Sequence, residues 1–153
     1  MNRALSSREL SYCGLFGAAA LLLPVLFHLF HLGHVFMPIY LPLVALAFFV
    51  TPLAASVTAF IVPLLSGAMT GMPPFYPPVA VFIALELSAM SAMIAFLAGR
   101  YPTLNEYVIL IPVLLAGRVL YIGLIYAFSL FIQFPAGFMA GLAFLKGWPG
   151  LLL

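Results

Sequence analysis

Two charged side chains, Glu86 and Arg118, each stand inside a long apolar run of the sequence. A charge within a membrane-spanning segment is costly and marks a functional site by default. At a rise of about 1.5 Å per residue, Glu86 lies roughly 12 Å from Pro78 at one membrane face, and Arg118 lies roughly 18 Å from Glu106 at the other. A hydrocarbon core is about 30 Å thick, so the two charges are predicted at similar depth. They either form an ion pair that holds the helices together or contact a polar solute in an outward cavity.

Three histidines, His28, His31 and His34, follow one another at intervals of three residues. Three imidazoles are typical of a metal or haem site, and one alternative is therefore a small intramembrane haem or metal protein or enzyme. Against it, the sequence contains no aspartate and one cysteine, Cys13. The other interpretations are ligand contact by His31 or His34 at the outer mouth, and polar packing.

Aromatic side chains gather toward the predicted outer half of the molecule. They form either the aromatic belt of a membrane interface or the walls of a site for a flat ligand. The residues concerned are Tyr40, Phe75, Tyr76, Tyr121, Tyr126 and Trp148.

The sequence shows no nucleophile paired with a base, no phosphate-binding glycine loop and no chain of proton-relay carboxylates. We therefore expect neither an enzyme nor a self-powered pump, and no resident cofactor or metal. The net charge of +2 is too small to indicate nucleic-acid binding.

The composition defines the elements that must hold these side chains. Hydrophobic residues make up 67% of the chain and charged residues 5%, whereas a soluble domain carries about 25% charged residues. This predicts an all-α integral membrane protein. Its 153 residues allow five or six spans of about 20 residues, which form a single transmembrane domain over 1–153.

Apolar runs and prolines set the predicted helices. The expected segments are 11–32, 38–50, 52–69, 79–98 and 107–131. The segment 38–50 is short, Pro24 loosens the first segment, and Pro63 interrupts the third. Residues 136–146 either span the membrane or lie at its interface. We favour an interfacial helix there, followed by a last helix that begins at Pro149 and is cut short at Leu153.

Basic residues near the span ends predict the orientation. Arg3, Arg8 and Arg100 fall on one side, which is expected to be cytoplasmic together with the N-terminus. The apolar run after Arg8 is followed by no small-residue cleavage site, and we interpret it as a retained span rather than a signal peptide. The stretch TGMPPFYPP, residues 70–78, then lies outside, where its four prolines prevent a helix.

Small residues at Gly14 and Ala18 are spaced so that a second helix can approach closely. This surface serves either the internal bundle or a partner protein.

Several stretches, taken together and in order, resemble a known family. They are PIYLPLVALAFFVTPLAASVTAFIVPLLSGAMTGMPP, then ALELSAM, LLAGRVLYIG and KGWPG. The pattern is similar to the substrate-binding (S) components of energy-coupling factor (ECF) transporters, in the branch that contains TGMPP. One departure is Tyr40 in PIYLP, where relatives often have histidine.

The resemblance implies a six-helix membrane bundle that captures a small water-soluble vitamin or vitamin precursor from outside. It further implies a transmembrane coupling subunit, which Gly14 and Ala18 would contact, and two ATPase subunits. The predicted solute contacts are Glu86, Arg118, Tyr121, Tyr76, Phe75, His34 and Tyr40. TGMPPFYPP is expected to close over the solute, with Gly71 and the prolines fixing its shape and Tyr76 as an anchor.

Overall fold

A computed structural model describes residues 6–29, 38–76 and 78–132 of the chain. Every regular element in these ranges is a helix. The helices are α1 (Ser7–Leu29), α3 (Tyr40–Leu46), α4 (Pro52–Thr70), α5 (Val79–Arg100) and α6 (Glu106–Ile132). Four of them contain stretches long and apolar enough to cross a membrane: Ser7–Phe27, Pro52–Thr70, Val79–Arg100 and Glu106–Leu130. The described part is therefore that of an all-helical, multi-pass membrane protein.

The six-helix count predicted from the sequence remains a prediction. The expected interfacial segment 136–146 and the last helix at Pro149–Leu153 lie outside the described residues.

The five predicted segments correspond to the five helices, and the differences at their ends have local causes. α1 begins at Ser7 rather than at residue 11, because Ser6 and Glu9 form a capping box. The Glu9 amide donates to Ser6 Oγ over 3.2 Å, and the Ser6 amide donates to Glu9 Oε2 over 3.1 Å. This reciprocal pairing satisfies amides that the first helical turn leaves without partners.

The prediction that Pro63 interrupts its span was wrong. α4 runs from Pro52 to Thr70 with Pro63 inside it, and α1 likewise continues through Pro24. Proline within a membrane helix removes one backbone hydrogen bond, and close packing by neighbouring helices makes it tolerable. Pro63 is fully buried against such neighbours.

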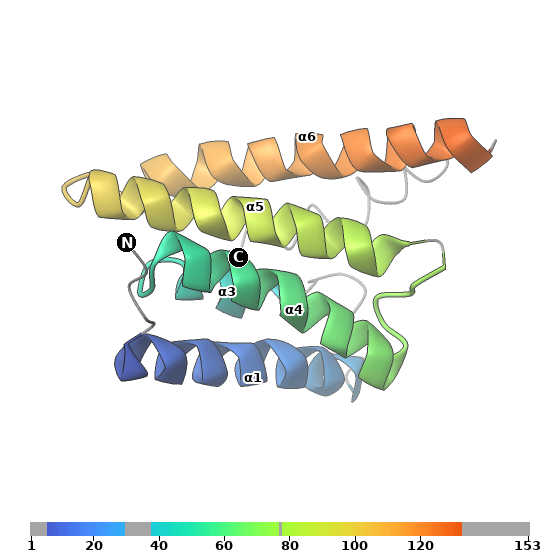
Figure 1. The fold of residues 1–153 in the computed structure, drawn as a ribbon, viewed down its shortest axis with the longest axis horizontal. Helices are drawn as coiled ribbons and strands as arrows, with labels where there is room; N and C mark the ends of the chain where they lie inside the picture. The colour runs from blue at the N-terminus through green and yellow to red at the C-terminus, as the bar shows by residue number, and fades with distance from the viewer. Residues whose placement is uncertain (1–5, 30–37, 77, 133–153) are drawn as a thin grey trace.

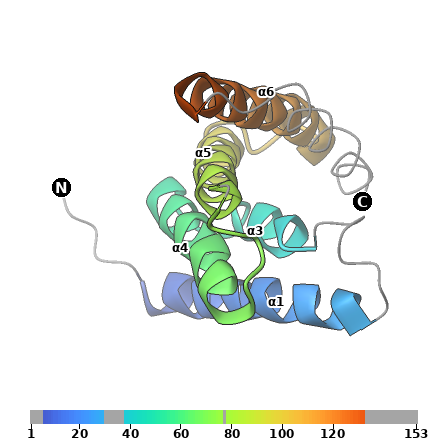
Figure 2. The same ribbon diagram turned by 90° about the vertical axis from the view of Figure 1, so that its right-hand side faces the viewer.

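α3, α4 and α6 pack around α5. α4 and α6 lie on either side of it, α1 packs against α3 and α4, and α3 contacts α1, α4 and α5 (Figures 1 and 2). α6 packs mainly against α5. Besides Arg118, its buried positions recur every four residues and so mark one face of the helix: they are Ile109, Val113, Gly117, Tyr121, Ile125 and Ser129.

The short helix α3 ends at Leu46, a few residues before α4 begins at Pro52. The amides of Ala47, Phe48 and Phe49 each donate to a carbonyl three residues earlier, over 2.9–3.2 Å. These bonds satisfy carbonyls that the end of a helix would otherwise leave without partners. Ser91 Oγ of α5 donates to the Leu43 carbonyl over 3.5 Å. The end of α3 is therefore held both by its own last turn and by α5.

Tight connections join the long helices. Gly71 ends α4 in the left-handed conformation, with φ 73°, and its amide donates to the Gly67 carbonyl. Residues 101–105 form the turn between α5 and α6, closed by the Leu104 amide donating to the Tyr101 carbonyl over 3.1 Å. Asn105 Oδ1 accepts from the Tyr107 amide over 3.0 Å and caps α6.

Candidate functional site

The structure brings Glu86 of α5 and Arg118 of α6 together. Arg118 Nη1 lies 3.5 Å from Glu86 Oε1. Glu86 is 0% exposed and Arg118 is 9% exposed. The prediction of a buried pair on neighbouring helices is confirmed. It followed from counting residues inward from opposite ends of two antiparallel spans, which needs only the helical rise.

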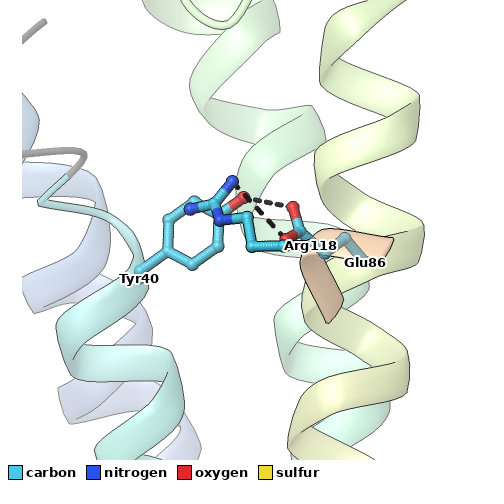
Figure 3. A network of polar contacts seen from close by, with 3 residues as sticks. All are labelled: Tyr40, Glu86 and Arg118. Atoms are coloured by element: carbon cyan, nitrogen blue, oxygen red, sulfur yellow. Dashed lines mark hydrogen bonds and ion pairs between the residues drawn. The ribbon is translucent and has the colours of Figure 1, made fainter. Parts of the chain in front are cut away.

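Tyr40, at the start of α3, completes a three-helix cluster (Figure 3). Its hydroxyl donates a hydrogen bond to Glu86 Oε2, and the Arg118 guanidinium carbon lies 4.9 Å from the centre of its ring. The ring face attracts the guanidinium cation while the hydroxyl binds the carboxylate. Tyr40 therefore contacts both charges. The sequence indicates Tyr40 as an aromatic residue and a solute contact, but not its contacts with Glu86 and Arg118.

Tyr121 lies one turn beyond Arg118 on the same face of α6. It is 5% exposed and lies within electrostatic range of both Glu86 and Arg118. We use the name polar cluster for Tyr40, Glu86, Arg118 and Tyr121. The polar cluster presents a carboxylate, a guanidinium and two phenols with no net charge, a set that can recognise a polar solute carrying both donors and acceptors.

The polar cluster leaves one carboxylate oxygen incompletely satisfied. Glu86 Oε1 is buried and accepts no hydrogen bond from the described residues, although it is paired with Arg118 over 3.5 Å. A buried carboxylate oxygen normally accepts a hydrogen bond. A solute donor is a suitable partner for this atom.

The loop TGMPPFYPP lies at the opposite end of the bundle from the turn at 101–105 (Figure 1). Ser66 Oγ and Thr70 Oγ1 both donate to the Met72 carbonyl, over 2.8 and 3.1 Å. Phe75 packs over Gly67, where an added Cβ would stand 3.0 Å from the Phe75 ring and 2.7 Å from the Pro73 carbonyl oxygen. The last turn of α4 thus holds the first part of the loop.

Two of the predicted solute contacts in this loop are open to their surroundings. Phe75 is 48% exposed and Tyr76 is 78% exposed. Neither side chain is buried with the polar cluster, and closure of the loop over a solute stays a prediction. Gly71, which was expected to help fix the shape of the loop, has a positive φ, a conformation that glycine adopts without steric cost.

The histidines contribute no described site. His28 belongs to the last turn of α1, while His31 and His34 lie outside the described residues. Within residues 6–29, 38–76 and 78–132, no group of three or more potential metal ligands comes together. The metal alternative and the ligand role of His34 stay predictions. Of the other aromatic candidates, Tyr126 is 59% exposed and Trp148 lies outside the described ranges.

The small residues of α1 divide between two faces. Gly17 is buried against α4, with Val62 Cγ2 only 3.6 Å from where a Cβ would stand. Gly14 and Ala18 are exposed, and a Cβ at Gly14 would meet nothing within 4 Å. Gly14 and Ala18 are therefore available to an external partner, and Gly17 serves the internal bundle.

Glu9 is a structural residue that the sequence analysis passed over. Besides capping α1, its Oε1 accepts the Thr51 amide over 3.0 Å and so ties α1 to the start of α4. The spacing Ser6-x-x-Glu9 was the available signal for the cap. The contact with Thr51 has no local sequence signal, because the two residues are distant in the chain. Glu9 and the segment 47–52 line a surface hollow that also includes Gly99.

Comparison of the chain with protein-family models, with curated proteins and with solved structures found no match.

Proposed function

We propose that this chain is the substrate-capture subunit of an ECF-type importer, without an ATPase site of its own. It binds a small water-soluble vitamin or vitamin precursor from outside and carries it across the membrane together with a coupling subunit and two ATPases. The order of the resembling stretches along the sequence supports this proposal, as do the four candidate spans, in which α5 runs antiparallel to α4 and α6 (Figure 1).

The observation that carries the proposal is the buried polar cluster. Tyr40, Glu86 and Arg118 come from three different helices and meet inside an otherwise apolar bundle. Intramembrane charges are expensive and usually mark a substrate or ion pathway. An ion pair alone would need only two of these helices, whereas a site that encloses a solute needs walls from several.

The proposed orientation places the N-terminus and the 101–105 turn in the cytoplasm. The start of α1, which contains Arg8, and the end of α5 at Arg100 lie at the same end of the bundle, and the connection between α4 and α5 lies at the other (Figure 1). An excess of arginine marks the cytoplasmic side of membrane proteins. In a variant lacking Cys13, a cysteine at exposed Tyr76 should react with a membrane-impermeant thiol reagent in intact cells. A cysteine at Thr103 should react only after lysis, and the reverse pattern would refute the orientation.

The proposed partner face is the exposed side of α1 around Gly14 and Ala18. Helices associate closely in lipid where small residues let their backbones approach. We expect Gly14→Leu and Ala18→Leu to abolish co-purification with a co-expressed coupling subunit. An intact complex on size-exclusion chromatography would refute this face.

The solute-binding proposal is tested by native mass spectrometry of protein purified in mild detergent from cells grown in vitamin-containing medium. The wild-type chain should retain a small molecule. Glu86→Gln and Arg118→Gln should lose it, because each removes one charge from the polar cluster.

The chain offers a matched control for each variant. Glu106→Gln and Arg100→Gln remove the same charges from exposed positions, and both should retain the molecule. Absence of a retained molecule from the wild type, across media supplemented with the water-soluble vitamins, would refute the proposal. Equal loss of the retained molecule in the variants and in their controls would also refute the proposal.

A further inference from the structure

α5 and α6 are in close contact beside the polar cluster. Gly117 immediately precedes Arg118, and Met90 stands one turn after Glu86 on α5. A Cβ built on Gly117 would lie 2.6 Å from Met90 Cγ and nearer still to Met90 Sδ. No ordinary carbon contact is that short, so any side chain at position 117 would move either the thioether or the helix.

We propose that Gly117 and Met90 are positioning residues for the polar cluster. The hydrogen atom of Gly117 lets α6 approach the Met90 side chain, and this approach sets the distance at which Arg118 reaches Glu86. Met90 is 2% exposed, with buried Leu87 and Ile94 on the same helix. The thioether therefore has little free space into which to retreat.

The spacing matters because Arg118 must reach two elements at once. Its guanidinium contacts Glu86 of α5 and lies over the Tyr40 ring of α3, yet α6 packs mainly against α5. Moving α6 outward lengthens both contacts together. The attraction between charges falls with distance, and at 3.5 Å the ion pair already lies beyond hydrogen-bond length.

The helix contains a matched control. Gly123, also in α6, is exposed, and a Cβ there would meet nothing within 4 Å. Gly117→Ala and Gly123→Ala raise the intrinsic helix propensity of α6 equally. The difference between the two variants therefore reports the contact with Met90.

The test measures the energetic coupling between Glu86 and Arg118. Glu86→Gln, Arg118→Gln and the double change are compared by reversible unfolding in mixed micelles. The cycle is repeated in the Gly117→Ala, Gly123→Ala and Gly117→Ala/Met90→Ala backgrounds. Such a cycle isolates the pairwise interaction from general loss of packing.

We expect a coupling of about tenfold in the unfolding equilibrium constant for the wild type and for Gly123→Ala. Gly117→Ala should reduce the coupling between Glu86 and Arg118 to below about twofold. Adding Met90→Ala to the same chain should restore most of the coupling, because the shorter side chain makes room for the new methyl group. Should Gly117→Ala not fold, recovery of folding and coupling in the double variant supports the proposal. Unchanged coupling in Gly117→Ala, or a folded double variant without coupling, overturns it.

The consequence for solute capture rests on the proposed function. Gly117→Ala should lose the retained molecule in native mass spectrometry, and Gly123→Ala should keep it. If the wild type retains nothing, the proposed function fails, while the coupling cycle still decides whether Gly117 and Met90 position the charges. If the cycle behaves as expected but Gly117→Ala retains the solute normally, the positioning of a solute site is refuted.

Discussion

α5 and α1 are equally suited by composition to cross a membrane, yet they are held in the bundle in different ways. In the most apolar stretch of α5, 56% of the residues are buried, against 11% in that of α1. α5 contributes Glu86 to the polar cluster, and Ser88 of α5 shares a 2.8 Å hydrogen bond with Ser56 of α4. Polar contacts thus join α5 to its neighbours at depth.

α1 is attached mainly along one strip and at its beginning. Phe16 stacks on the Phe49 ring, and the Tyr12 ring lies tilted against it. In each pair the two ring centroids are 5.7 Å apart. Glu9 reaches the Thr51 amide at the end of the bundle. Lipid solvates apolar side chains as well as protein does, so hydrophobicity does not decide which helix is central. Close packing and buried polar contacts distinguish α5 from α1.

The largest expected effect comes from breaking the polar cluster. Arg118→Leu leaves the Glu86 carboxylate buried without its cation and should lower the free energy of unfolding by about 3–5 kcal/mol. Arg100→Leu, at an exposed position, should change it by less than about 0.5 kcal/mol. Unfolding in mixed micelles gives both values. Equal effects would show that the pair contributes nothing to the central position of α5.

The next largest effect separates the two faces of α1. Gly17→Leu forces a side chain against Val62 and should destabilise the protein by about 1–3 kcal/mol. Gly14→Leu, three residues away on the exposed face, should leave the free energy of unfolding within about 0.5 kcal/mol of wild type. The same unfolding assay applies. A destabilising Gly14→Leu together with a neutral Gly17→Leu would mean that α1 docks through its other face.

A smaller effect is expected between α4 and α5. Ser56→Ala and Ser88→Ala, measured singly and together, should show a coupling of about 0.6 kcal/mol, the usual size of a hydrogen bond between membrane helices. Ser129→Ala is a suitable comparison, because its hydroxyl bonds the Tyr126 carbonyl within α6. Coupling between Ser129 and Ser56 should be absent.

The smallest global effect is expected at Glu9. Because this carboxylate lines a hollow at the surface of the protein, Glu9→Gln should change overall stability little. It should nonetheless accelerate hydrogen exchange at the Thr51 amide, because this amide donates a hydrogen bond to the Glu9 carboxylate in the wild type. Glu106→Gln, which removes an exposed carboxylate from the start of α6, should leave exchange at Thr51 unchanged. An unaltered exchange rate at the Thr51 amide in Glu9→Gln would show that Glu9 does not link α1 to α4.

Much of the fold followed from the sequence, because apolar length and prolines mark helices in a membrane protein. The similar depth of Glu86 and Arg118 also followed, since depth depends only on residue count, and their ion pair is one of the two arrangements that the sequence allowed. The contact of Tyr40 with both charges did not, because the rotation of the short helix α3 is fixed by its neighbours.

The inward face of α1 could not be predicted either. Gly14, Gly17 and Ala18 are all small, and a helix surrounded by apolar side chains gives no amphipathic pattern to show which face is buried. Pro63 was misjudged because a proline rule from water-exposed helices was applied to a residue packed on all sides. The exposure of Tyr76 could not be predicted either, because the four prolines exclude a helix without fixing the path of the loop.

The short turn at 101–105 has a consequence for how the protein enters the membrane during synthesis. Glu86 leaves the ribosome before Arg118, and a lone carboxylate at the centre of a span opposes insertion. With so few residues between α5 and α6, the second helix follows at once and is antiparallel to the first. We therefore expect the two helices to pass from the translocon into the bilayer as one hairpin, with the acid and its cation already facing each other and the charge neutralised before lipid surrounds it.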